Sequence, residues 1–374
     1  MGSGGSRINS TITSKKFKNN EKKLFSNRSV SYPTDLATLK SSQHETLHKK
    51  TLPRIQTEQI ISNGGHQSLP RKVKPVKTPS KDVEWSISEL YNVLVAETWE
   101  AEPQLHSEEY LMLVDCRSPE EYKHSHIVTA VHSSNLQTDS DNMTLTSQPS
   151  FHHMIVLYGN NRKKVAELVR DQNNFTVNMI YEDSYSKFPF LCTNNLINNQ
   201  FQRKKLTKTW PSEVIPLKLY QGTAKHALNE TVIKNLGITH IVNITSVHPN
   251  AFPDNIKYLR IQLDDVASSD LLSWLPKTTA FIESAIGKGF SQGDTKDKTN
   301  NKVLVHCNMG RSRSSTIVLG YLMRCLCWSL QDACDWLKEC RQTVKPNDGF
   351  LNQLMLYEVE VFGKQLSDFN KLPL

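Results

Sequence analysis

The feature that most constrains this chain is a short apolar run, Lys302–His306, that passes directly into a polar loop containing Gly310. A helical pattern follows the loop. The order predicts a buried strand, a tight turn and a helix N-terminus. Backbone N–H groups and the positive end of the helix dipole converge in such a turn, so it can bind an anion.

Cys307 follows the predicted strand directly. The converging donors favour its thiolate form, so Cys307 is the candidate nucleophile for attack on phosphorus, through a phosphocysteine intermediate. The guanidinium of Arg313 can hold two phosphoryl oxygens, and Ser314 can donate a hydrogen bond to the leaving thiolate. The candidate substrate-binding residues between them are Asn308, Met309, Gly310, Arg311 and Ser312.

Two further roles are expected around this loop. His306 should support the structure of the loop and transfer no proton. A leaving oxygen needs a proton, which requires a carboxylic acid above the loop. A predicted strand over Tyr258–Leu263 ends in Asp264 and Asp265, and spacing does not choose between them.

The string His-Cys-x-x-Gly-x-x-Arg-Ser, from His306, resembles the protein tyrosine phosphatase signature, and residues 210–363 resemble the dual specificity phosphatases. Strings such as Leu236-Gly-Ile-Thr and Pro346-Asn-x-Gly-Phe carry the resemblance. In that family the acid closes an Ile-x-x-x-Asp strand, which implies Asp265. The resemblance also implies hydrolysis of phosphotyrosine and phosphoserine or phosphothreonine, with no cofactor and no metal.

A second α/β pattern precedes the first, in residues 82–190. Its string LVDCRSPEEYKHSHIVTAVH resembles the rhodanese-homology fold. Active rhodaneses carry a catalytic cysteine after the next strand, where this sequence has Tyr158 and Gly159. We therefore expect no sulfur transfer from this domain, and we interpret Cys116 as a small packing residue.

A rhodanese-like domain ahead of such a phosphatase resembles the MAP kinase phosphatases. The string from Glu89 also resembles the serine/threonine/tyrosine-interacting-like subfamily, whose mammalian members lack the catalytic cysteine that is present here as Cys307. MAP kinase phosphatases carry a docking cluster of arginines after the His-Ile strand. The string SSNLQTDSDNMTLTSQ stands there without a basic residue, so a MAP kinase partner would need another surface.

The overall prediction is an α/β protein with a mainly parallel sheet in each domain, flanked by helices. We expect a disordered basic tail over 1–81, a rhodanese-like domain over 82–190, a linker over 191–209 and the phosphatase domain over 210–365. The tail has a formal charge of +12 and the rest of the chain −4. Because the folded part is mildly acidic, we expect no nucleic-acid partner.

The cysteines and the N-terminal residues bear on where in the cell the protein is located. Seven scattered cysteines, an odd number, predict a reduced, cytoplasmic setting. Gly2 followed by Ser6 fits the N-myristoylation pattern, and one acyl chain gives only marginal membrane binding. Peripheral membrane association and nuclear entry stay open.

Two alternative functions also stay open. The first is a phosphoinositide or phospholipid phosphatase, because Arg311 adds a charge and Gly-Arg-Ser-Arg-Ser resembles the loop of phosphatidylglycerophosphate phosphatases. The second is a scaffold that binds phosphoproteins without turnover. The presence of Cys307 and Asp265 argues against it.

Overall fold

The structure is a computed structural model that describes residues 83–136, 154–170, 177–180, 187–287 and 300–374. All of these belong to one compact unit of the chain. The tail over 1–81, Gly2 and most of the string without basic residues lie outside the described residues. No helix in the described part is long and apolar enough to cross a membrane.

The first domain is built on a parallel sheet with the strand order β1-β6-β5-β2-β4. Its strands are β1 (Val83–Trp85), β2 (Met112–Asp115), β4 (Val131–His132), β5 (Ile155–Tyr158) and β6 (Val177–Ile180). Its helices are α2 (Ile87–Leu94), α3 (Pro119–His124) and α4 (Arg162–Arg170). Ser86 and Ser118 each begin a helix with a capping box, which pairs otherwise unsatisfied backbone N–H groups.

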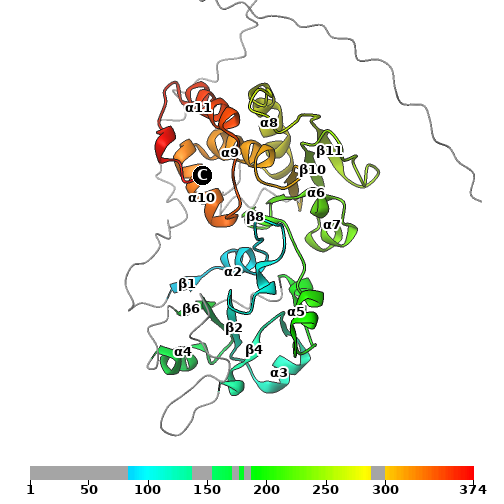
Figure 1. Cartoon of the computed structure of the whole chain (residues 1–374), viewed down its shortest axis with the longest axis vertical. Coiled ribbons are helices and arrows are strands. Elements are labelled where there is room, and N and C mark those ends of the chain that lie inside the picture. The colour runs from blue at the N-terminus through cyan, green and yellow to red at the C-terminus, as the bar shows by residue number, and fades with distance from the viewer. Residues whose placement is uncertain (1–82, 137–153, 171–176, 181–186, 288–299) are drawn as a thin grey trace, which may run out of the picture. The chain divides into compact units, whose positions relative to one another are not determined.

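The second domain contains a sheet in the order β11-β10-β12-β9-β8, in which only the β8–β9 pair is antiparallel. These strands are β8 (Ser212–Ile215), β9 (Leu219–Gly222), β10 (His240–Asn243), β11 (Lys257–Arg260) and β12 (Val303–His306). The helices are α6 (Ala224–Ala227), α7 (Glu230–Leu236), α8 (Leu275–Ile286), α9 (Arg313–Leu326), α10 (Leu330–Cys340) and α11 (Asp348–Phe362). Figure 1 shows both sheets and their helices. The predicted α/β class is confirmed.

Strand β12 lies in the middle of the second sheet, between β10 and β9. All four of its residues are buried, as expected for a parallel strand that is covered on both faces. Helix α8 begins at Leu275, after a 3₁₀ turn over Leu272–Trp274, with Pro276 in its first turn. Gly237 ends α7 in the left-handed conformation, at φ +67°.

The segment 191–209 contains regular structure where the sequence suggested only a linker. Strand β7 (Cys192–Thr193) pairs with β3 (His126–Ile127), and helix α5 (Gln200–Leu206) follows it. The guanidinium of Arg203 donates to the Leu105 carbonyl at 2.8 Å. The sequence contains little sign of these elements, because the few apolar residues that pack on the core, such as Ile197 and Leu206, follow no regular period.

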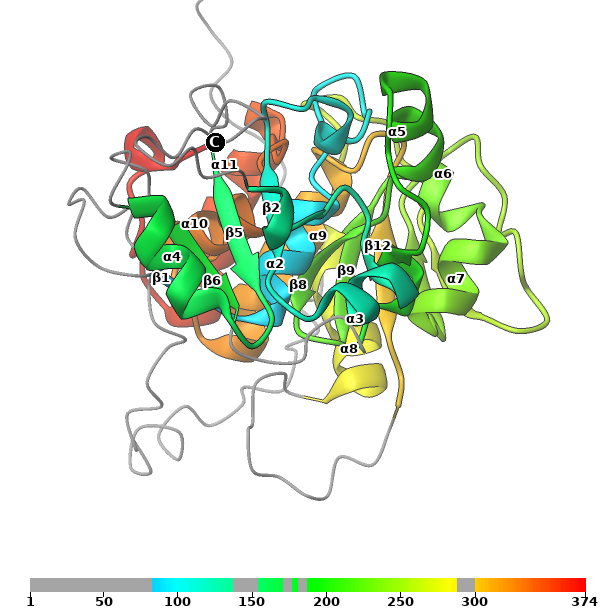
Figure 2. The same ribbon diagram turned by 90° about the horizontal axis from the view of Figure 1, so that it is seen from below.

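The two domains share a hydrophobic core. Figures 1 and 2 both place α2 between the two sheets, in contact with β8. The Tyr91 side chain is fully buried there, and its hydroxyl donates to the Pro211 carbonyl at 3.0 Å. The Asn92 side chain exchanges two hydrogen bonds, each 2.8 Å long, with the backbone of Glu213. The hydrophobic cluster around Tyr91 extends to Tyr220 and Leu304 of the second sheet. Buried side chains of the two domains therefore pack against each other.

We predict that Tyr91→Ala lowers the free energy of unfolding of the full chain by about 3–5 kcal/mol, because it leaves a cavity between the domains. Tyr91→Phe, which loses only the hydrogen bond to Pro211, should cost about 1 kcal/mol. Urea unfolding measures both values. Leu196→Ala, at a side chain that is 57% exposed, is the control. A loss for Tyr91→Ala as small as that of the control would contradict a shared core.

Candidate active site

The loop after β12 lies at the carboxyl end of the central strand, where open α/β sheets bind ligands. Cys307 is only 1% exposed, and its Sγ lies 3.4 Å from the hydroxyl of Ser314. Ser314 belongs to the first turn of α9, which starts at Arg313. The thiol therefore faces the positive end of a helix of 14 residues.

Gly310 closes this loop against strand β9. Its φ is +66°, and a Cβ at this position would lie 2.6 Å from the Gly222 carbonyl oxygen. No other residue type fits such a position without strain. The Gly310 carbonyl accepts hydrogen bonds from Gln221 Nε2 at 3.0 Å and from Arg341 Nε at 2.8 Å. The turn is thus fixed from both sides by buried side chains.

Arg313 is 5% exposed and is oriented by the loop that follows β11. Its Nη1 donates to the Leu263 carbonyl at 2.9 Å, and its Nε lies 3.5 Å from Asp265 Oδ2. One edge of the Arg313 guanidinium is therefore held by the Leu263 carbonyl and the Asp265 carboxylate.

The two neighbouring aspartates lie in different environments. Asp265 Oδ1 accepts from Ser312 Oγ at 2.6 Å and from Asn347 Nδ2 at 2.9 Å. Asp264 instead accepts from Ser246 Oγ at 2.7 Å. Of the two, only Asp265 has a hydrogen bond to the loop that carries Cys307. The structure thus places the Asp265 carboxylate beside this loop, and its role as the acid stays a prediction.

The remaining loop residues differ in exposure. Asn308 and Met309 are exposed, and the Asn308 carbonyl accepts from the Ala224 N–H at 3.1 Å. The Arg311 guanidinium lies over the Trp99 ring, with its carbon 4.8 Å from the ring centre, and donates to the Trp99 carbonyl. The Arg311 charge, which had suggested a lipid phosphatase, therefore contacts the first domain.

His306 is buried beneath the loop, at 2% exposure. Its Nδ1 lies 3.4 Å from the Cys307 carbonyl oxygen. Burial lowers the pKa of His306 to about 4, so the ring is neutral at physiological pH. A neutral imidazole in this position suits the structural role that the sequence suggested.

Four contributors to the site were missed from sequence: Gln221, Asn347, Arg341 and Glu97. Asn347 lies in the Pro-Asn-x-Gly-Phe string, so its side-chain bond to Asp265 had a usable signal. Gln221 and Arg341 are single polar residues at the ends of a strand and a helix. Nothing in their spacing points to the Gly310 carbonyl that both bind.

The rhodanese-like domain has a polar network where active rhodaneses carry their cysteine. The Tyr158 hydroxyl donates to Asp115 Oδ2 at 2.8 Å, and Arg117 pairs with the same carboxylate at 2.6 Å. Cys116 is buried, and burial raises the pKa of its thiol to about 12. A thiol with so high a pKa is a poor nucleophile, which suits a packing role.

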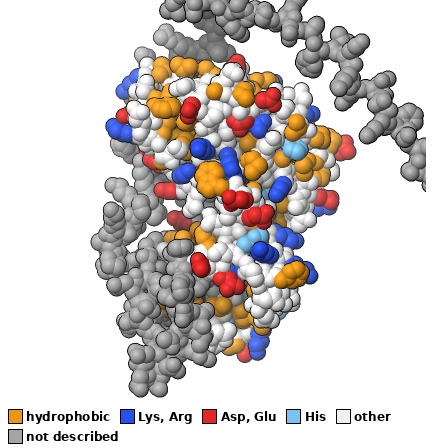
Figure 3. Space-filling model, in the orientation of Figure 1, with side chains coloured by type: hydrophobic (Ala, Val, Ile, Leu, Met, Phe, Trp, Pro, Cys, Tyr) orange, Lys and Arg blue, Asp and Glu red, His pale blue; other side chains and the backbone are white. Residues whose placement is uncertain are grey.

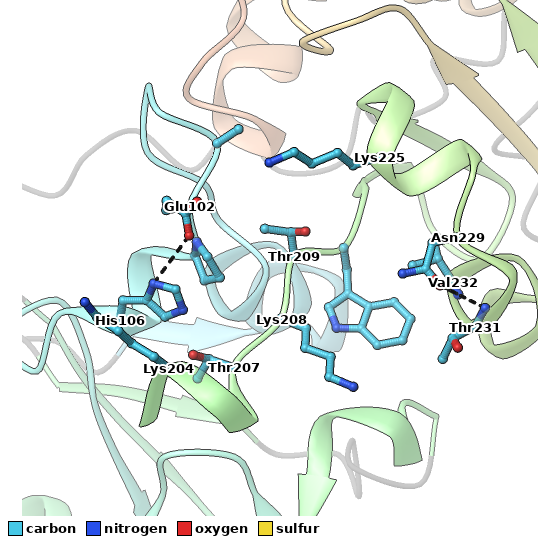
Figure 4. A pocket seen from close by; sticks show the side chains of 13 residues that line it. Glu102, His106, Lys204, Thr207, Lys208, Thr209, Lys225, Asn229, Thr231 and Val232 are labelled. Carbon is cyan, nitrogen blue, oxygen red and sulfur yellow. Dashed lines mark hydrogen bonds and ion pairs between the residues drawn. The ribbon is translucent and has the colours of Figure 1, made fainter. Parts of the chain in front are cut away.

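Away from the Cys307 loop, a cavity of about 350 Å³ is lined by segments of both domains (Figure 4). Four basic side chains, His106, Lys204, Lys208 and Lys225, and one acid, Glu102, contribute to its lining. None of the predicted site residues lines it. Among the described residues, no group of three or more His, Cys, Asp or Glu side chains is arranged to hold a metal ion.

Comparisons with known proteins identify both domains. Residues 219–360 match the family model "Dual specificity phosphatase, catalytic domain", and residues 99–188 match "Rhodanese-like domain". The chain therefore contains a domain of the dual specificity phosphatase type with a rhodanese-like domain ahead of it, as the sequence predicted.

Among its relatives is dual specificity protein phosphatase 1-A of Xenopus laevis, which is 34% identical over 157 residues, covering 42% of this chain and 39% of the relative. Human dual specificity protein phosphatase 16 is 29% identical over 289 residues, covering 68% of this chain and 41% of the relative. The chain thus spans about two fifths of the length of these relatives. The structure of human tyrosine phosphatase-like serine/threonine/tyrosine-interacting protein is 28% identical, covering 41% of this chain and 98% of that one, with a TM-score of 0.36.

The low pKa of His306 predicts a pH dependence of stability. The folded-state pKa of about 4 lies below the ordinary value of 6.5, so the unfolded chain binds more protons between these values. Stability should therefore fall as the pH drops from 6.5 to 4, by about 3 kcal/mol for this group. His306→Gln should flatten this part of the profile in urea unfolding. His124→Gln, at an exposed side chain, should leave it unchanged. Parallel profiles for His306→Gln and the unaltered protein would contradict the assignment.

Proposed function

We propose that this protein hydrolyses phosphotyrosine and phosphoserine or phosphothreonine in protein substrates. The observation that carries the proposal is the placement of the Cys307 thiol, 3.4 Å from Ser314 Oγ at the start of α9. A buried guanidinium and a carboxylate complete the site, because Arg313 lies beside Asp265.

In the proposed first step the Cys307 thiolate attacks phosphorus and the S–P bond forms. Arg313 holds two of the phosphoryl oxygens. The bond from phosphorus to the leaving oxygen breaks, and Asp265 gives that oxygen its proton.

In the second step water attacks the phosphocysteine, and Asp265, now a carboxylate, accepts a proton from the water. The S–P bond breaks, inorganic phosphate leaves, and the Ser314 hydroxyl donates a hydrogen bond to the released thiolate. The contact of 3.4 Å between Sγ and Oγ is already suited to this role.

The alternatives have less support. A lipid phosphatase would use the Arg311 charge at the mouth of the site, and this side chain contacts Trp99 instead. On the face shown in Figure 3, basic and acidic side chains are interspersed, without the continuous basic surface that a nucleic-acid partner would need.

A phosphorylated MAP kinase is the substrate that the resemblance to the MAP kinase phosphatases suggests. The basic cavity of Figure 4 offers a binding place for an acidic segment of a phosphoprotein.

The rhodanese-like domain would act without sulfur chemistry. Acylation of Gly2 and peripheral membrane association stay predictions from sequence.

We predict that Cys307→Ser abolishes hydrolysis of a small aryl phosphate, of phosphotyrosine and phosphothreonine peptides, and of any phosphoinositide that the unaltered protein hydrolyses, because it removes the nucleophile. Release of inorganic phosphate measures turnover. The matched control is Cys327→Ser, at an exposed thiol, which should keep full activity. Residual activity above a few per cent would refute Cys307 as nucleophile. Faster turnover of phosphoinositides than of peptides would favour the lipid phosphatase.

We predict that Asp265→Asn slows hydrolysis of peptide phosphates by roughly 10²–10⁴-fold, the usual size of general acid catalysis. Aryl phosphates with a good leaving group should lose less, since their leaving oxygen needs little protonation. The control is Asp264→Asn, whose carboxylate has its hydrogen bond with Ser246. A larger loss for Asp264→Asn than for Asp265→Asn would reverse the assignment.

A further inference from the structure

The segment between α2 and β2 brings a buried carboxylate from the first domain to the active-site loop. Glu97 is only 5% exposed. Its Oε2 lies 2.7 Å from Nη2 of Arg341, and its Oε1 lies 3.1 Å from Nε2 of His226. Both of these partners belong to the phosphatase domain and are themselves almost fully buried.

Arg341 transmits this contact to the loop that carries the nucleophile. Its Nε donates to the Gly310 carbonyl at 2.8 Å, and its Nη2 donates to the Met309 carbonyl at 3.4 Å. Its Nη1 donates to Ser212 Oγ at 3.2 Å. The guanidinium therefore bridges Glu97 to two successive carbonyls of the phosphate loop, at the turn that only glycine can make.

The charges in this cluster are balanced. Burial by itself would raise the pKa of Glu97, but hydrogen bonding from His226 and the charge of Arg341 outweigh it and lower that pKa to about 2. Burial lowers the pKa of His226. Its Nδ1 accepts from the Thr223 N–H at 3.2 Å, so the neutral ring carries its proton on Nε2, which lies 3.1 Å from Glu97 Oε1. The carboxylate and the guanidinium thus form an ion pair, with a neutral imidazole beside it.

A second contact joins the same segment to the same loop. Two residues after Glu97, the Trp99 ring lies under the Arg311 guanidinium, and its carbonyl accepts from Arg311 Nη2. The segment 97–99 therefore touches the loop from its buried side, through Arg341, and from its outer side. A displacement of about 1 Å in such a loop can cost roughly a hundredfold in rate.

We propose that Glu97 is a positioning residue for the phosphate-binding loop, acting through Arg341, and that the rhodanese-like domain thereby completes the phosphatase site. This rests on the proposed function in one respect, namely that the loop binds the phosphoryl group. Without the carboxylate, Arg341 is a buried cation lacking its counter-ion. It turns toward other acceptors and releases the Gly310 carbonyl.

The test uses the full chain with Glu97→Gln, which keeps the shape of the side chain and removes its charge. We expect kcat/KM for a small aryl phosphate to fall about tenfold or more and the Kd for vanadate, measured by calorimetry, to rise about tenfold. Amide hydrogen exchange in 307–313 should speed up. The control is Glu100→Gln, at an exposed carboxylate of the same segment. Values for Glu97→Gln within twofold of those of the control would overturn the proposal.

A second variant separates positioning from stability. Glu97→Gln combined with Arg341→Met removes both charges, so the uncompensated buried cation is gone and the thermal midpoint should recover. The Gly310 carbonyl still lacks the bond from Arg341 and keeps only the bond from Gln221 Nε2, so we expect vanadate binding to stay weak. Recovery of binding along with stability would show that Glu97 has only a structural role. Vanadate binding needs no turnover, so failure of the proposed hydrolysis would appear separately, as an unaltered protein that binds vanadate and hydrolyses nothing.

Discussion

The carbonyl group of Gly310 is the point on which the geometry of the site depends. It lies at the turn between β12 and α9, and it accepts hydrogen bonds from Gln221 on one side and Arg341 on the other. A buried carbonyl without a donor costs roughly 1–3 kcal/mol, so both donors hold the turn in one conformation. The position of the Cys307 thiol at the start of α9 follows from that conformation.

The Gly310 turn is also linked to the first domain, through Arg341 and Glu97. Arg341 needs a carboxylate to remain buried, and that carboxylate, Glu97, comes from the first domain. Breaking a buried ion pair on one side typically costs about 3–5 kcal/mol. Apolar packing around Tyr91 joins the domains independently of this pair. A rhodanese-like domain can thus contribute through contacts to the loop of its neighbour that carries Cys307.

Much of this site could be predicted from the sequence. The apolar strand, the glycine turn and the helix start are consecutive, so the spacing of Cys307 and Arg313 alone brings the two side chains to one loop. Spacing left Asp264 and Asp265 open, because adjacent aspartates after a strand look alike, and the resemblance to the phosphatase family implied Asp265. Its contacts with Ser312 and Asn347 distinguish it from Asp264. The strand and helix within 191–209 were not predicted, because their few apolar contacts to the core, from Cys192 and Leu206, form no periodic pattern.

By itself the sequence determined the α/β class, the two-domain order and the loop that carries the candidate nucleophile, because each depends on residues close together in the chain. Only the tertiary structure decided which distant side chains support that loop. Glu97 and Arg341 are 244 residues apart in sequence and 2.7 Å apart in space. A single acid and a single arginine have no local pattern that marks them as partners. Their pairing depends on how the two sheets pack around α2, and burial then makes the contact strong.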